Sequence, residues 1–151
     1  MTRRDPRAAV VRGCLIGVAA LPLLPRLLGN VHALTPLSDL ALRWFSFQCQ
    51  RDPTRGLLIL GQPLPVCARC SGIYLGFGLG ALLLRPRLAL RGLRLWVGAA
   101  STLMLLDVFS EAFALRPAWA PLRVLSGALL SYPVSAALVH AARTRFSTQS
   151  P

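Results

Sequence analysis

The sequence predicts an all-α integral membrane protein, a bundle of about four transmembrane helices with a short amphipathic helix at the membrane interface. Apolar residues make up 54% of its 151 residues and charged residues only 15%, whereas a soluble domain carries about a quarter charged residues. Long apolar segments alternate with clusters of arginine. The apolar fraction excludes a disordered chain, and too little polar surface remains to cover a large water-soluble core. We therefore expect a single membrane domain, residues 1–151.

Four segments come close to the length of about 20 residues that a helix needs to cross roughly 30 Å of hydrocarbon. Each contains few charged residues, and these lie mostly near the segment ends. Small residues in the second segment are typical of helices that pack tightly inside a membrane. The four expected helices are residues 8–28, 65–84, 93–113 and 122–142.

The first of these segments is the least regular. Pro22 and Pro25 predict a kink or break in its last turns, because proline lacks the N–H that a helix interior requires. A cleaved signal peptide is the alternative, since arginines precede the apolar run and Val31 and Ala33 could form a cleavage site. Retention as a helix is favoured because Pro25 and Arg26 interrupt the region before that site.

The arginines indicate how the chain is oriented. All 17 basic residues are arginine and the net charge is +12, which would favour nucleic acid if the charge lay on a polar surface. Here the clusters lie between apolar segments, so the expected partner is the lipid bilayer and no nucleic acid. Basic residues near helix ends are retained on the cytoplasmic side. The denser clusters then place both termini in the cytoplasm and the connection between the first two helices outside the cytoplasmic membrane.

That connection contains a further helix. Thr35 can cap it with Pro36 at the first helical position. Apolar residues then recur at helical spacing as Leu37, Leu40, Ala41, Trp44 and Phe45. Such a helix either lies at the membrane interface, anchored by its aromatic residues, or packs back on the bundle.

Three of the four cysteines fall on the predicted external side. Cys14 lies within the first helix, where a thiol usually acts as a small packing residue. Cys49 is followed by the motif Cys67-Ala68-Arg69-Cys70. With Pro65 at the first helical position, Cys67 and Cys70 share one face of an opening helical turn. The positive end of that helix, with Arg69 and Arg55, favours thiolates there.

Three clustered thiolates are compatible with three kinds of chemistry. They can bind a transition metal such as zinc or iron, with a fourth ligand or an open position for water or substrate. They can also exchange disulfides, or form a structural disulfide in an oxidising compartment. Candidate fourth ligands on the same side are Asp39, His32, Asp52, Asp107 and Glu111.

Two acids lie in the third predicted helix. Asp107 and Glu111 are four residues apart and therefore share a face. An acid within a membrane span costs several kcal/mol unless it is buried and paired. We expect Arg123 to be the counter-ion of Asp107, and Glu111 to lie in the solvated headgroup region.

Glycines recur every fourth residue in the second predicted helix, at Gly72, Gly76 and Gly80. Their stripe lets another backbone approach closely. The stripe indicates a helix-packing partner or a homo-oligomer, and it favours a scaffold or assembly role as one further functional class.

The cysteine motifs resemble those of a family of small bacterial and archaeal membrane proteins known as domain of unknown function 2085. The resemblance covers about residues 40–130 and continues through Asp107 and Arg123. It implies no activity, but it implies that Cys49, Cys67, Cys70, Arg55, Asp107 and Arg123 form one shared motif set. This chain has Gln50 where the family has His after the first cysteine, and Gly56 where it has Ser, so an acid or water would have to complete a metal site. The run that carries the resemblance is Phe47-Gln48-Cys49-Gln50-Arg51, then Gly61-Gln62-Pro63-Leu64-Pro65-Val66-Cys67-Ala68-Arg69-Cys70-Ser71-Gly72-Ile73-Tyr74-Leu75-Gly76.

The leading functional hypothesis is metal binding by Cys49, Cys67 and Cys70. The alternative is a membrane thiol-disulfide oxidoreductase with quinone as cofactor. Quinone-linked disulfide-generating enzymes and the vitamin K epoxide reductase family also place Cys-x-x-Cys at the external end of a four-helix bundle, a likeness of architecture only. For any catalytic reaction the candidate residues are Cys67, Cys70, Asp107 and Arg123.

Overall fold

The chain is described by a computed structural model that covers residues 6–29, 35–49, 56–59, 62–83, 88–115, 117 and 119–144. This part of the chain is mostly helical. Three of its helices are long and apolar enough to cross a membrane, at Pro6–Leu28, Leu90–Ala112 and Ala120–Arg143, and the apolar helix Ala68–Leu83 is shorter. The predicted class, a helical membrane protein, agrees with these findings.

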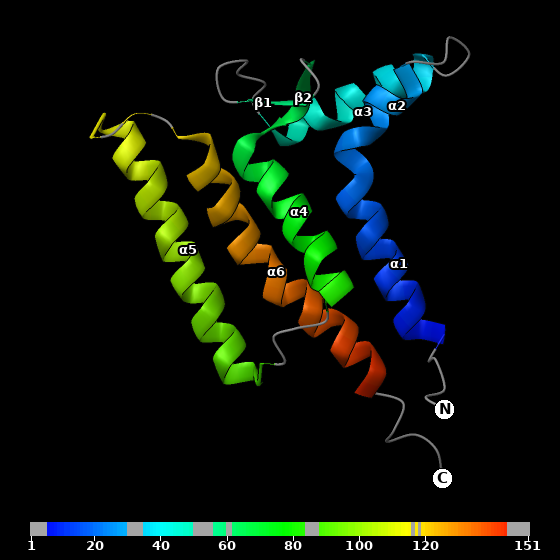
Figure 1. Cartoon of the computed structure of the whole chain (residues 1–151), viewed down its shortest axis with the longest axis vertical. Helices are drawn as coiled ribbons and strands as arrows, with labels where there is room; N and C mark the ends of the chain where they lie inside the picture. The colour runs from blue at the N-terminus through cyan, green and yellow to red at the C-terminus, as the bar shows by residue number, and fades with distance from the viewer. Residues whose placement is uncertain are drawn as a thin grey trace.

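The three long helical segments and the shorter helix Ala68–Leu83 lie side by side (Figure 1). Helix α4 packs against both α1 and α6, and α5 packs mainly on α6. Helices α1 and α5 run opposite to α4 and α6, so the start of α1 and the end of α6 lie at one end of the bundle. The short elements gather at the other end. In chain order the elements are α1 (Pro6–Ala20), the 3-10 turn η1 (Leu21–Leu23), α2 (Leu24–Gly29), α3 (Thr35–Gln48), β1 (Gly56–Ile59), β2 (Gln62–Cys67), α4 (Ala68–Leu83), α5 (Leu90–Ala112) and α6 (Ala120–Thr144).

The prolines of the first segment break it as predicted. Helix α1 ends at Ala20, Pro22 lies in η1 and Pro25 opens α2. The Ser38 hydroxyl of α3 donates a hydrogen bond to the Pro25 carbonyl at 2.8 Å. This bond ties α3 to the bend at the end of the first helix. Helix α3 begins at Thr35, within one residue of the predicted start at Pro36.

The second predicted helix begins later than expected. Residues 65–67 belong to β2, which pairs antiparallel with β1 so that Gly56 faces Cys67. We predicted no strand here, and the placement of Pro65 in a first helical turn was wrong. Proline is tolerated because both strands of a two-stranded sheet are edges. Cys67 is therefore the last residue of β2, and Cys70 lies in the first turn of α4.

The glycine stripe of α4 packs on α6 of the same chain. A Cβ atom built on Gly72 or Gly80 would overlap the backbone carbonyl of Val124 or Tyr132, and one on Gly76 would overlap Ser131 and the Ala128 backbone. The predicted close approach of a second backbone is thus confirmed, and the packing partner is α6.

Serines of α6 add hydrogen bonds across this interface. Ser131 donates to the Ile73 carbonyl at 2.8 Å and Ser135 donates to the Phe77 carbonyl at 2.7 Å. Both serines are buried. Small residues and inter-helical hydrogen bonds are what hold helices together when lipid removes the hydrophobic driving force between them.

A proline in α6 is compensated by α5. Pro133, which is fully buried, has no N–H to donate to the carbonyl of Leu129 one turn earlier. The indole Nε1–H of Trp96 donates to that carbonyl at 2.8 Å. Since water is absent from the hydrocarbon region, a carbonyl without a donor there would cost several kcal/mol. The hydrogen bond therefore satisfies the Leu129 carbonyl of α6 and fastens α5 to α6.

We expect Trp96→Phe to lower the free energy of unfolding by about 1–3 kcal/mol, because it removes the donor and leaves the Leu129 carbonyl unsatisfied. The measurement is reversible unfolding in mixed detergent micelles. A double-mutant cycle with Pro133→Ala supplies the control, since alanine restores an N–H one turn from Leu129. Equal costs of Trp96→Phe in both backgrounds would contradict this role of Trp96.

Candidate metal centre

The three cysteines that the sequence groups are brought together at one end of the bundle. The Sγ atoms of Cys49, Cys67 and Cys70 all lie within 4.8 Å of one another. They come from three elements: Cys49 follows α3, Cys67 ends β2 and Cys70 lies in α4. All four cysteines of the chain fall in described segments and are thiols, and Cys14 is exposed on α1. We call Cys49, Cys67 and Cys70 the thiol cluster.

Contacts between α3 and α4 position the first cysteine. The Tyr74 hydroxyl donates to Gln48 Oε1 at 3.0 Å, and the Tyr74 ring meets the Phe45 ring edge to face with centroids 6.2 Å apart. Phe45 is only 2% exposed. The Cys67 backbone N–H donates to Cys49 Sγ at 3.2 Å. The end of α3 is therefore held against the junction of β2 and α4.

The thiols of the cluster differ in acidity. A hydrogen bond from the Cys70 thiol lowers the pKa of Cys67 to about 5, against the opposing effect of burial, with help from the backbone N–H groups of Cys70 and Arg69. Burial raises the pKa of the Cys49 thiol. Cys67 precedes α4 directly, so it receives the first N–H groups of a helix, where negative charge is stabilised. The hydrogen bond to Cys67 raises the pKa of the Cys70 thiol. One thiolate beside two thiols at neutral pH suits metal ligation as well as disulfide exchange.

We expect Cys67 to be alkylated by iodoacetamide at about pH 6.5 in reduced, metal-free protein, because the thiolate is the nucleophile and its folded-state pKa lies below this pH. The ordinary reference value for this thiol is 9.0. Mass spectrometry of peptides measures the rate at each cysteine. In Cys70→Ala the main hydrogen-bond donor is lost, and the alkylation midpoint of Cys67 moves to higher pH. An unmoved midpoint would contradict the role of Cys70.

No carboxylate or imidazole among the described residues joins the three sulfurs. Asp39 is exposed on α3, and Asp107 and Glu111 take part in ion pairs described below. The other candidate ligands, His32 and Asp52, lie outside the described residues, as does Arg55.

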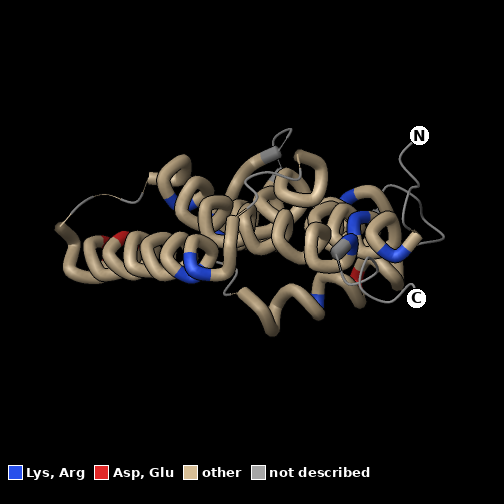
Figure 2. Tube along the Cα trace, turned by 90° about the horizontal axis from the view of Figure 1, so that it is seen from below, with Lys and Arg blue, Asp and Glu red and all other residues tan. Residues whose placement is uncertain are grey.

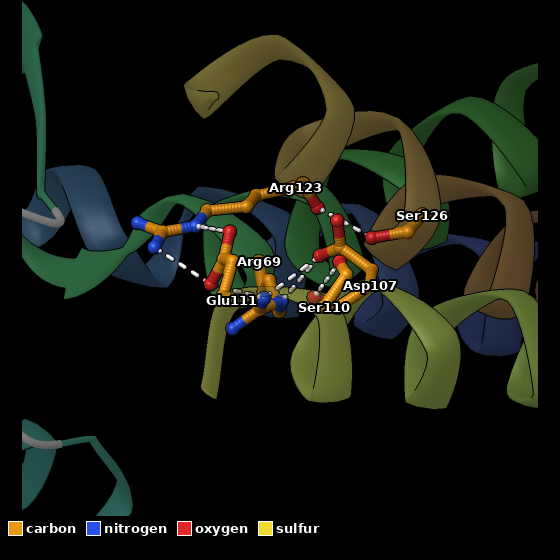
Figure 3. Close-up of polar contacts among 6 residues, drawn as sticks. All are labelled: Arg69, Asp107, Ser110, Glu111, Arg123 and Ser126. Carbon is orange, nitrogen blue, oxygen red and sulfur yellow. Dashed lines mark hydrogen bonds and ion pairs between the residues drawn. The ribbon is translucent and has the colours of Figure 1, made fainter. Parts of the chain in front are cut away.

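Two arginines and two acids form a network of ion pairs at the same end of the bundle as the thiol cluster. We call this network the ionic quartet: Arg69, Asp107, Glu111 and Arg123 (Figure 3). Arg69 donates from Nε and Nη2 to Asp107 Oδ2 at 3.0 and 2.7 Å, and from Nη2 to Glu111 Oε2 at 2.7 Å. Arg123 donates from Nε and Nη2 to the two Glu111 oxygens at 2.7 and 2.8 Å. Glu111 thus bridges both guanidinium groups.

Asp107 and Arg123 of the quartet are buried, Arg69 and Glu111 are largely covered, and the four formal charges cancel. The side chains are 14% exposed for Arg69, 4% for Asp107, 10% for Glu111 and 5% for Arg123. The expectation that Glu111 is solvated was wrong, because that carboxylate lies between two arginines. Sequence reasoning also missed Arg69 as the partner of Asp107 and assigned its charge to the thiols. One signal could have found this pair, because Arg69 was predicted to lie on the same side of the membrane as both acids.

The quartet joins three helices at the end of the bundle that holds the thiol cluster. Arg69 comes from the first turn of α4, the acids from α5 and Arg123 from α6. Arg69 also lies between Cys67 and Cys70 in the chain, so its ion pairs fix the segment that carries these two cysteines. We conclude that the quartet holds the β2–α4 junction against α5 and α6.

These features define a small helical membrane protein with a three-cysteine cluster at one end. The family model described as "Predicted membrane protein (DUF2085)" matches residues 49–136, which is more than half of the chain. The chain belongs to this family, as its cysteine motifs indicate. The match begins at Cys49 and includes the whole thiol cluster and the ionic quartet. Neither the curated proteins nor the solved structures gave a match.

Proposed function

We propose that the protein binds a transition metal, such as zinc or iron, through Cys49, Cys67 and Cys70. The observation that carries the proposal is the convergence of three sulfur atoms from three separate elements to within 4.8 Å of one another. Thiolates are preferred ligands of zinc and iron. A fourth position is left for water, for a substrate or for a side chain.

The spacing of the sulfurs fits such a centre. Tetrahedral coordination at a metal–sulfur distance of about 2.3 Å separates the sulfurs by about 3.8 Å, which lies inside the observed limit. The Cys67 thiolate is already favoured, so fewer protons have to be released on binding. The described residues supply only sulfur, and three sulfurs without a fourth protein ligand resemble open sites more than closed structural ones.

We also propose that α4 is the fourth span of a single membrane domain. Its 16 residues rise about 24 Å, somewhat less than a full bilayer core. It nevertheless extends between α1 and α6 over much of the bundle (Figure 1). Burial of its glycine face against α6 leaves its other faces to meet α1 and lipid.

We place the thiol cluster on the external side of the cytoplasmic membrane, with both termini in the cytoplasm. In the view along the bundle, arginines outnumber the acids, and most of the tube is uncharged (Figure 2). At the end opposite the cluster lie Arg7, Arg12, Arg91, Arg94 and Arg143. At the cluster end lie four described arginines, Arg26, Arg43, Arg69 and Arg123, of which the last two are paired with acids. The excess positive charge therefore favours the opposite end as the cytoplasmic one. Labelling of Cys49 by a membrane-impermeant thiol reagent only from the cytoplasm would contradict this orientation.

Titration of the reduced, metal-free protein with Co²⁺ tests metal binding. We expect about one Co²⁺ per chain, with an absorption band from thiolate-to-cobalt charge transfer. Cys67→Ser and Cys70→Ser should abolish the band and Cys49→Ser should weaken it, whereas Cys14→Ser, outside the cluster, should leave it unchanged. A charge-transfer band of equal strength in all four variants would overturn the proposal.

The acidity of Cys67 beside Cys70 favours a second candidate, a quinone-linked thiol-disulfide oxidoreductase. In that reaction two thiols would lose two electrons and two protons to form a disulfide, and the quinone would be reduced to the quinol. Cys67→Ser should then trap a mixed disulfide through Cys70 or Cys49, visible under non-reducing conditions. Absence of any such adduct would count against this candidate.

A further inference from the structure

Helix α3 carries an apolar stripe that the rest of the described chain leaves uncovered. Leu37, Leu40, Trp44 and Phe47 are spaced by three and four residues and so lie on one side of the helix. They are 49%, 64%, 61% and 89% exposed. We call these four residues the α3 stripe. Residues elsewhere on the helix, such as Phe45 and Ser38, are buried.

The orientation of α3 shows where this stripe lies. Figure 1 shows α3 running across the end of the bundle, while the long helices run along it. Its 14 residues reach about 21 Å, too short to cross a bilayer. The Ser38–Pro25 hydrogen bond fixes it at the level where the first membrane helix bends. Helix α3 is therefore placed where the apolar surface of the spans meets the headgroups, with the stripe among its exposed residues.

The chemistry of the helix matches a lipid interface. Leucine, phenylalanine and tryptophan are the residues that bury into the boundary between headgroups and acyl chains, and an indole suits that boundary because it is apolar with one polar edge. Asp39, Arg43 and Ser46 are exposed on a separate strip of the same helix. Helix α3 thus has a face for the bundle, a face for lipid and a face for water.

We infer that the α3 stripe is a membrane-docking surface, and that docking holds Cys49 against Cys67. Phe47 and Cys49 are two residues apart, and the helix end between them is attached to α4 through Gln48 and Tyr74. A helix that rested on the bundle alone would expose four large apolar side chains to water. Contact with lipid removes that cost and fixes the direction from which Cys49 enters the cluster.

The docking is tested by quenching of tryptophan fluorescence in vesicles of phosphatidylcholine and phosphatidylglycerol with brominated acyl chains. The full chain is compared with Trp44→Phe, and the difference isolates Trp44 from the other tryptophans. We expect bromine at shallow acyl positions to quench the Trp44 signal more strongly than bromine at deep positions. A Trp44 signal that no bromolipid quenches would overturn the inference.

The effect on Cys49 is tested by dibromobimane, a short reagent that fluoresces when it bridges two thiols. The reduced, metal-free protein carries Cys14→Ser and Cys70→Ala, so that only Cys49 and Cys67 can be bridged. We expect Leu40→Ser with Phe47→Ser to lose most of the crosslink, and Arg43→Ser with Ser46→Ala, on the water-facing strip, to retain it. Equal crosslinking in the two double variants would overturn the role of docking. Both readouts are independent of metal, so they stand whether or not Co²⁺ binds.

Discussion

Glu111→Gln is expected to lower the free energy of unfolding by about 3–5 kcal/mol, the range measured when one partner of a buried ion pair is removed. The amide keeps the shape of the side chain but removes the charge that faces both Arg69 and Arg123. Two largely covered guanidinium groups would then have only the charge of Asp107 to balance them. Reversible unfolding in mixed micelles measures the loss.

Asp39→Asn is the matched control, because Asp39 is an exposed acid on α3. Surface charges contribute about 0–1 kcal/mol, so this variant should remain close to the parent protein. We expect Asp107→Asn to be costly as well, since Arg69 donates two hydrogen bonds to that carboxylate. A loss for Glu111→Gln no larger than that for Asp39→Asn would show that the quartet is not a structural element.

Gly76→Ala is expected to cost about 1–3 kcal/mol or more, because its Cβ atom would overlap the Ala128 backbone of α6. Backbone cannot move aside as the end of a flexible side chain can, so α4 and α6 have to separate. The serine hydrogen bonds across the same interface would lengthen with them. The same unfolding measurement applies.

Gly98→Ala is the control for Gly76→Ala, and we expect the opposite effect from it. Gly98 lies inside α5 with nothing within 4 Å of a built Cβ atom. Alanine is about 1 kcal/mol better than glycine in a helix interior, so this change should be neutral or stabilising. If Gly76→Ala were as well tolerated as Gly98→Ala, the close packing of α4 on α6 would be contradicted.

The sequence predicted the helices well because a membrane span is specified locally. An apolar segment of sufficient length has few alternatives in a bilayer, since only helices and closed barrels satisfy every backbone group there. Prolines at 22 and 25, and the start signal at Thr35 and Pro36, act within one or two turns, so their effects can be read without knowledge of the fold. The glycine stripe predicted a close helix contact, although it could not name α6 as the partner.

The β-hairpin could not be predicted with the same ease. The run Leu57-Leu58-Ile59-Leu60 is apolar without alternation, a pattern that fits a strand and a helix equally. Pro63 and Pro65 argue against a strand in a wide sheet, but a two-stranded hairpin has only edges. Gly61 after the apolar run was the available turn signal. The helix start consequently moved from Pro65 to Ala68, which separates Cys67 from the helix that holds Cys70.

Local sequence patterns also do not determine which arginine pairs with which acid. The sequence shows that Asp107 in a span needs a cation, and several arginines lie on the same predicted side. Which one reaches it depends on how α4, α5 and α6 are placed in space. The structure pairs Asp107 with Arg69 and gives Arg123 to Glu111. By contrast, the grouping of the three cysteines was predictable, because cysteines at this spacing are typical of only a few kinds of site, namely metal centres and disulfides.

Elemental analysis of the protein purified in detergent tests the metal proposal most directly. The protein is compared with Cys67→Ser/Cys70→Ser and with Cys14→Ser, and free thiols are counted in the same samples. We predict about one equivalent of zinc or iron in the parent and in Cys14→Ser, and none in the double variant. Metal-free parent protein with two thiols missing would contradict the proposal, because the cluster would then hold a disulfide.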